Sequence, residues 1–122
     1  MRLEEIIETI KQRPDAHRIG MILAHTGIVR GTTKEGRPVR ELTVSVDHDK
    51  LAEIIERERR APGIVDIQVE VVEGRTLRVG EEIMRLVVAG DVRENVIGAL
   101  ERALNEIKSA ATSKSQIFEP EP

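Results

Sequence analysis

The fold of this chain is best read from residues 17–46, HRIGMILAHTGIVRGTTKEGRPVRELTVSV. Residues 17–30 are apolar and β-branched enough for a strand, in which Gly20 and Gly27 indicate bulges or close backbone contacts. The segment GTTKEG then turns the chain, and VRELTVSV alternates apolar and polar residues as a half-buried strand does. We therefore predict two strands that pair around a basic hairpin.

The rest of the chain alternates helices with strands. Apolar spacing predicts helices over residues 2–12 and 48–60, and a last helix that begins at Asp91 with a capping-box pattern. Two more strands are predicted in IVDIQVEVV, residues 64–72, and EIMRLVVAG, residues 82–90. The order α-β-β-α-β-β-α indicates an α+β sandwich with antiparallel strand pairs rather than a doubly wound parallel sheet.

The same pattern sets the domain organisation. We expect one domain over residues 1–111, with a turn-rich connection between the last two strands at EGRTLRVGE, residues 73–81. Periodicity is lost near the C-terminus, so residues 112–122 are predicted to form a flexible tail.

The composition excludes several classes of protein. The 122 residues suit one compact domain, and 19 Lys and Arg against 22 Asp and Glu give a formal net charge of −3, so no overall field favours nucleic acid or anionic membranes. One Phe and no Trp or Tyr leave no base-stacking surface, and the lack of Cys excludes disulfides and thiolate sites. We find no signal-peptide pattern and no membrane-length apolar run, and we expect a soluble cytoplasmic protein.

Histidines and arginines are the first candidates for chemistry. His17, His25 and His48 lack the spacing of a metal site, so we expect no metal. His25 is the exception to consider, because it stands five residues before Arg30 on the same predicted strand. Arg93, in the first turn of the last helix, opposes the helix dipole but would suit a phosphate bound to the backbone N–H groups.

The predicted hairpin is rich in cations. Arg30, Lys34, Arg37 and Arg40 lie in it, and Arg18 joins them if the two strands pair. One interpretation is a solvated turn. The other is one wall of a pocket for an anionic substrate, with Arg30 as its main member and the other loop cations in solvent.

Two segments match a family pattern by their spacing. The first pattern reads roughly G-x-x-x-x-F-x-G-x-V-R, then a polar loop with glycine, then V-x-x-L. The chain matches it at Gly20, Gly27, Val29, Arg30, Gly36, Val39 and Leu42. The segment RVGEEIMRLVVAGDVRENVIGALERALNEIK, residues 78–108, follows G-(D/E)-x-x-V-x-V-x-V-x-S-x-H-R-x-x-A-F…L-K. Residues 17–108 thus resemble the large, catalytic subunit of molybdopterin synthase, the MoaE family.

This resemblance implies a fold, a reaction and partners. The family has an α/β hammerhead-type fold and forms a homodimer, and each large subunit receives a small ubiquitin-like sulfur-carrier subunit to give a heterotetramer. The C-terminal glycine thiocarboxylate of the small subunit gives sulfur to cyclic pyranopterin monophosphate, and two transfers build the dithiolene. The resemblance therefore implies a sulfurtransferase of molybdenum cofactor biosynthesis with a pterin substrate and no cofactor of its own.

The resemblance also assigns site residues. Arg30 and Arg93 correspond to substrate-binding arginines, and Lys108 corresponds to a candidate catalytic lysine near the end of the last helix. A second catalytic lysine of the family falls at Ser115, so we expect Lys114, one residue away, to replace it.

The chain departs from the family pattern at other positions. Val92 stands where the family has a histidine, which removes a proton-transfer group unless His25 approaches from its strand. An upstream His-Arg pair is reduced to VVEGRT, in which Arg75 is the cation that remains as a substrate-binding candidate. The segment TVSVDHD lacks the aromatic residues that the family has there.

Three functions stay open on these residues. The chain is a working synthase subunit, a non-catalytic homodimeric binding or scaffold protein for a sulfur carrier or a pterin, or an unrelated small α+β interaction module. If it is catalytic, Arg30, Arg93 and Lys108 are expected to converge on one pocket at a dimer or partner interface, within about 10 Å of one another, because catalysis depends on such positioning.

Overall fold

A computed structural model describes residues 1–120 and arranges them in two antiparallel sheets with helices. The first sheet has the order β1 (Met21–Ile28), β5 (Glu82–Gly90) and β3 (Ile64–Val71). The second has the order β4 (Thr76–Arg78), β2 (Val39–Val46) and β6 (Thr112–Phe118). The helical elements are α1 (Leu3–Lys11), η1 (Ala16–Arg18), α2 (His48–Arg59), α3 (Arg93–Glu106) and the π-helical turn η2 (Ile107–Ala111). The predicted α+β class with antiparallel strands is confirmed.

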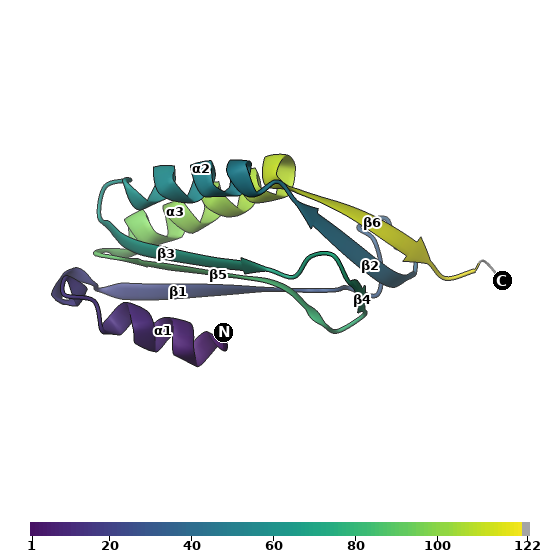
Figure 1. Cartoon of the computed structure of the whole chain (residues 1–122), viewed down its shortest axis with the longest axis horizontal. Helices are drawn as coiled ribbons and strands as arrows, with labels where there is room; N and C mark the ends of the chain where they lie inside the picture. Colours follow the sequence, from purple (N-terminus) through teal and green to yellow (C-terminus); the bar gives the residue numbers. More distant parts are fainter. Residues whose placement is uncertain (121–122) are drawn as a thin grey trace.

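The helices cover both faces of the first sheet (Figure 1). In β5, Leu86 and Val88 pack into the core below α2 and α3, whereas Val87 and Ala89 pack with α1 on the other face. Side chains alternate along a strand, so a central strand covered on both faces needs a continuous apolar run. That is why LVVA in β5 lacks the polar alternation of a half-exposed strand.

The predicted pairing of the first two strands is wrong. β1 pairs with β5, and β2 pairs with β4 and β6 in the other sheet. The loop between them closes on itself, since Val39 N–H donates to the Gly31 carbonyl. Val29 then packs with β2 in a separate apolar cluster beyond the first sheet.

This topology also removes Arg18 from the basic loop. Arg18 precedes β1 and Arg30 follows it, and the eight residues of that strand span about 26 Å at 3.3 Å per residue. The proposed group of five cations is therefore wrong, because it depended on a pairing that does not form.

The predicted flexible tail is wrong for residues 112–118. They form β6, which pairs with β2 from Thr112 opposite Val46 to Phe118 opposite Val39. The short strand β4 lies within the predicted turn connection and pairs with the other edge of β2. These two strands are additions to the predicted element order. The remaining predicted tail includes residues 121–122, which lie outside the described residues.

The start of α3 is fixed by a close backbone crossing. Its N-cap is Val92 rather than the predicted Asp91. The Asp91 carboxylate instead accepts hydrogen bonds from the Asn95 side chain (2.9 Å) and the Val92 N–H (2.6 Å). Gly20 N–H donates to the Gly90 carbonyl at 2.8 Å, and a Cβ on Gly20 would overlap the Asp91 carbonyl oxygen.

We predict that Gly20→Ala lowers the free energy of unfolding by about 2–3 kcal/mol, because one extra carbon here forces two backbone segments apart. Urea denaturation measures the change. Gly31→Ala is the matched control, since its Cβ would meet only Val79 Cγ1 at an ordinary 3.6 Å. Equal stabilities of the two variants would contradict the prediction.

Candidate functional site

Lys108 lies where the helical layer meets the second sheet. α3 ends at Glu106 and continues as η2, in which Ile107 and Ala111 are buried and Lys108 is exposed. π-helical turns are rare and occur frequently at functional sites, mostly within α-helices, whereas this one follows the end of α3. The chain then enters β6 directly, so Lys108 projects beside the junction of the two sheets.

His25 faces the same side of the first sheet as α3. It lies opposite Leu86 in β5, and Leu86 shares a core cluster with Ile107 of η2. Its Nε2 atom is buried and has no hydrogen-bond partner among the described residues. Burial is the larger cause, and the nearby Lys108 charge the smaller, of a His25 pKa that lies below its ordinary value of 6.5. A buried polar atom without a partner costs about 1–3 kcal/mol, which a purely structural residue would avoid.

The lowered pKa predicts a pH dependence of stability. The unfolded chain binds more protons at His25 than the folded chain, so the contribution is complete above the ordinary value of 6.5 and is lost as the pH falls towards the folded pKa. We predict that His25→Phe flattens the fall of the unfolding free energy just below pH 6.5, as measured by urea denaturation across that range. An unchanged slope in the variant would contradict the assignment.

Two carboxylates do not interfere with that measurement. Hydrogen bonds from Arg13 to Asp15 and from Asn95 to Asp91 lower the pKa values of both carboxyl groups below their ordinary 3.8. Their stabilisation is present above 3.8 and is lost only at lower pH.

Lys114 and Arg30 each lie next to a residue of the apolar cluster that Val44 and Val29 share, and Arg30 Nε donates to the Thr32 carbonyl at 2.8 Å. In β6, Lys114 is opposite Val44 and shares its face, because directly opposed residues of an antiparallel pair point the same way. Val44 packs there with Val29, which precedes Arg30. Ser115 is opposite Thr43 and so points to the other face. Lys114, and not Ser115, therefore lies on the face of the second sheet against which Val29 packs.

Arg93 lies far from this group within one copy of the chain, whereas Arg75 lies next to it. Arg93 is the first residue of α3, and the 15 residue steps from it to Lys108 correspond to about 22 Å at 1.5 Å per residue. Arg75 follows Gly74, whose N–H donates to the carbonyl of Val44, the residue opposite Lys114, and Arg75 forms an ion pair with Glu81 at 3.8 Å. Within one copy of the chain, Arg93 is therefore too far from Lys108 for the expected convergence within about 10 Å, and convergence at a dimer or partner interface stays a prediction.

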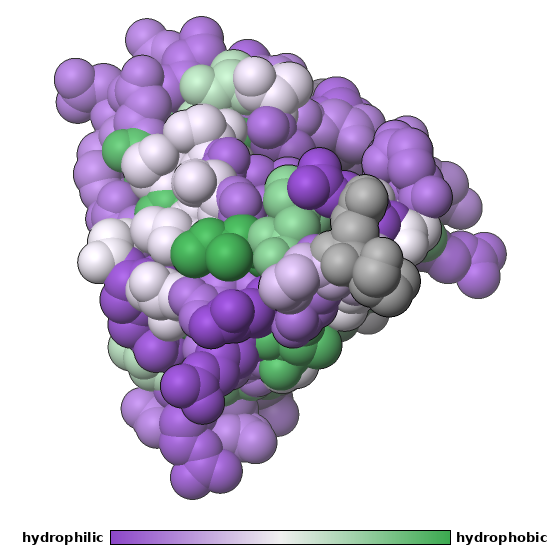
Figure 2. All heavy atoms as spheres, turned by 90° about the vertical axis from the view of Figure 1, so that its right-hand side faces the viewer, coloured by the Kyte–Doolittle hydropathy of each residue, from purple (hydrophilic) through white to green (hydrophobic). Residues whose placement is uncertain are grey.

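The other loop cations have different environments. Arg37, expected to be a solvated charge, stacks on the Phe118 ring with its guanidinium carbon 3.6 Å from the ring centroid. This contact ties the basic loop to the end of β6, and the only hint of it in the sequence is a single Phe in the predicted tail. Arg40 Nε lies 3.7 Å from the Oε1 atom of Glu41, and the Lys34 side chain is exposed. Figure 2 faces the end of the molecule at which β2 and β6 lie, and most of that surface is hydrophilic.

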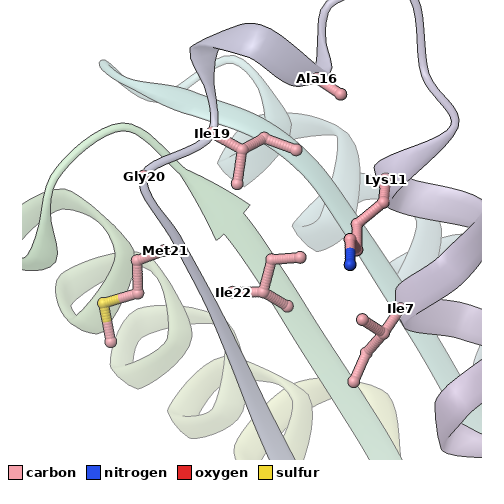
Figure 3. Close-up of a pocket in the computed structure, with 7 residues that line it drawn as sticks. All are labelled: Ile7, Lys11, Ala16, Ile19, Gly20, Met21 and Ile22. Atoms are coloured by element: carbon pink, nitrogen blue, oxygen red, sulfur yellow. The ribbon is translucent and has the colours of Figure 1, made fainter.

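The described part of the chain contains no cluster of three metal-ligating side chains. His48 instead pairs with Glu73 at 2.6 Å. A hollow of about 520 Å³ lies between α1 and the start of β1, and is lined by Ile7, Lys11, Ala16, Ile19, Gly20, Met21 and Ile22 (Figure 3). It contains a single charged side chain and lies at the opposite end of β1 from Arg30. None of the helices in residues 1–120 is long and apolar enough to cross a membrane.

Comparisons with known proteins agree with this fold. A family model described as MoaE protein matches residues 1–110. A structure of molybdopterin synthase from Staphylococcus aureus is 23% identical, with a TM-score of 0.79, over 99% of this chain and 88% of that one. The molybdopterin cofactor biosynthesis protein E of Burkholderia multivorans is 21% identical, with a TM-score of 0.74, over 97% and 84%.

A third similar structure contains two different subunits. It is the complex of subunits 1 and 2 of the molybdopterin-converting factor from Helicobacter pylori, and the match is 16% identical, with a TM-score of 0.71, over 98% of this chain and 80% of that one. No curated protein matches the chain.

Proposed function

The chain belongs to the MoaE protein family, and from this we propose that it is the large subunit of a molybdopterin synthase. In this proposal a small subunit brings sulfur as a C-terminal thiocarboxylate, and the chain transfers it to cyclic pyranopterin monophosphate during molybdenum cofactor biosynthesis. The cytoplasmic location expected from the sequence stays a prediction.

The observation that carries the proposal is the group of cations around the sheet junction. Lys108 lies in η2, Lys114 lies opposite the buried Val44 in β6, and Arg30 follows the end of β1, and all three side chains are exposed. A cyclic phosphate and a thiocarboxylate are both anionic, and preorganised cations hold such groups and stabilise the charge that develops during transfer. We assign catalysis to Lys108 and Lys114, and substrate binding to Arg30.

Arg93 contributes only if two copies of the chain share a site. One helix separates it from Lys108, so a site that uses both residues takes them from different subunits. Val92 and Ile97 beside it are 49% and 44% exposed, which gives this end of α3 an apolar surface suited to a protein contact. We therefore include a homodimer in the proposal, with one small subunit for each large one. Arg75 remains a weaker substrate-binding candidate because Glu81 pairs with it.

A second function is favoured by one specific observation. Val92 stands where the family pattern has a histidine, and it is the N-cap of α3 without a side-chain hydrogen bond. A valine transfers no proton, so a protein that binds a sulfur carrier or a pterin without converting it is the alternative.

Reconstitution separates the two functions. The purified chain is mixed with cyclic pyranopterin monophosphate and a thiocarboxylated small subunit from the same genome, and the dithiolene product is measured. Product that requires both partners supports the synthase. A stable complex of the two proteins without product supports the binding protein, and neither complex nor product contradicts both.

Mixed dimers test the shared site. Arg93→Ala and Lys108→Ala chains are each expected to be inactive, and a mixed dimer is expected to recover up to about half of the wild-type rate because one of its two sites is intact. Continued inactivity of verified mixed dimers would assign both residues to one subunit or to other roles.

A further inference from the structure

The Nε2 atom of His25 is buried but makes no hydrogen bond among the described residues, so packing alone does not explain why a histidine stands at this position. Met21 and Leu23 pack into the core on one face of β1, and His25 is the next residue on that face. The following position on the face is Gly27, and a Cβ there would lie 3.7 Å from His25 Nε2. That distance is an ordinary van der Waals contact, so Nε2 lies next to Gly27, in the direction in which β1 runs towards Arg30.

Two apolar side chains of β5 and one cation of η2 lie near the ring. Leu86 lies opposite it in β5, and Met84 of β5 lies against Gly27. From η2, the Lys108 ammonium is the charge that acts on the imidazole. Nε2 itself is buried without a hydrogen bond. Buried polar atoms are almost always satisfied, and a catalytic role is one reason for an exception, so this atom beside a cation is a candidate for the site.

We propose that His25 is the proton acceptor of the Lys108 site, and that an anion held by Lys108 determines when it can act. This inference rests on the proposed function for the identity of the substrate. It assigns the proton-transfer role to a strand residue and not to the position that Val92 occupies.

The proposed step is a proton transfer. The bond between a proton and a substrate oxygen or sulfur breaks, a bond from that proton to the Nε2 lone pair forms, and the neutral ring becomes an imidazolium. Without an anion, the Lys108 ammonium opposes this second positive charge. A phosphate or carboxylate paired with Lys108 removes the opposition, so the base becomes effective when the site is loaded.

Titration by NMR tests the coupling directly. The chain has three His, one Phe and no Tyr or Trp, so its imidazole signals are readily resolved and assigned. The pKa of His25 is measured in inorganic phosphate and in chloride at equal ionic strength, with His17 and His48 as internal references. We expect phosphate to raise the His25 pKa. We expect Lys108→Met to raise it without phosphate and to abolish the response.

Two titration results would overturn the proposal. One is a His25 pKa that Lys108→Met leaves unchanged. The other is an equal response of all three histidines to phosphate, which would indicate a general ionic effect.

The second test of the proposal measures sulfur transfer by two variants, His25→Phe and His25→Gln. Phe keeps an aromatic ring without a proton acceptor, and Gln keeps a polar group that cannot act as a base. Both are expected to lower kcat about 100-fold with little change in KM, and to lose the acidic limb of the wild-type pH profile. Wild-type kcat and pH profile in both variants would overturn the proposal. If the wild-type chain transfers no sulfur, the proposed function fails, and the titration alone decides the role of His25.

Discussion

Lys108→Ala is expected to reduce dithiolene formation in the reconstituted system about 100-fold or more, because it removes the cation that holds the reacting anions. Lys108 is exposed on η2, whereas its neighbours Ile107 and Ala111 carry the packing of that turn. The substitution is therefore expected to leave the free energy of unfolding unchanged within about 0.5 kcal/mol. Single-turnover product formation and urea denaturation give the two numbers.

A charge-matched variant and a remote control sharpen this test. Lys108→Arg keeps the positive charge but cannot release a proton, so partial activity would assign the lysine to electrostatic binding rather than proton transfer. Lys11→Ala removes an exposed lysine from α1, on the other face of the first sheet, and is expected to be neutral. Wild-type rates for Lys108→Ala would remove the residue from the site and weaken the synthase proposal.

The sequence predicts the elements of this fold better than their pairing. The helices α2 and α3 and the strands β3 and β5 follow their apolar periodicity, which is a local property. The partner of β1 depends on which distant segment hydrogen-bonds along its edge. Strand β5 does so, and β2 belongs to another sheet and another apolar cluster. A hairpin expectation based on closeness in the sequence therefore fails here.

Strand β6 shows a different limit. Its sequence TSKSQIF is polar and does not alternate, so nothing local predicts a strand. It forms because β2 offers a free edge, because the Ser45 and Ser113 hydroxyls bond at 2.8 Å, and because Arg37 stacks on Phe118. All three causes come from residues far away in the chain.

Part of the candidate site could also be predicted from the sequence, and part of it could not. The family resemblance makes Lys108 and Arg30 candidates, and their placement follows from the ends of a helix and a strand. The distance between Lys108 and Arg93 could have been read from helix geometry, because both lie in the last predicted helix. The buried Nε2 of His25 beside Lys108 could not, since it depends on how η2 packs against the first sheet.

Arg102→Ala is expected to lower the free energy of unfolding by about 2–3 kcal/mol, because it leaves a carboxylate buried without its main partner. Glu58 in α2 is 4% exposed and accepts hydrogen bonds from Arg102 Nε at 3.0 and 3.3 Å, and Arg102 Nη2 lies 2.9 Å from Glu58 Oε1. Arg57, at 3.6 Å from Glu58, remains as a weaker partner and keeps the loss below that of an isolated buried charge. Urea denaturation is the measurement.

Two further variants decide whether the buried charge is the cause. Lys50→Ala breaks an exposed ion pair with Glu53 on α2 and is expected to cost less than about 0.5 kcal/mol. The double change Glu58→Leu with Arg102→Met removes both charges and fills the space with apolar atoms, so its stability is expected to return to within about 1 kcal/mol of the wild type. If Arg102→Ala costs no more than Lys50→Ala, then Arg57 satisfies Glu58 by itself. If the double variant is less stable than Arg102→Ala alone, the ion pair itself, and not the burial of an unmatched charge, holds α2 to α3.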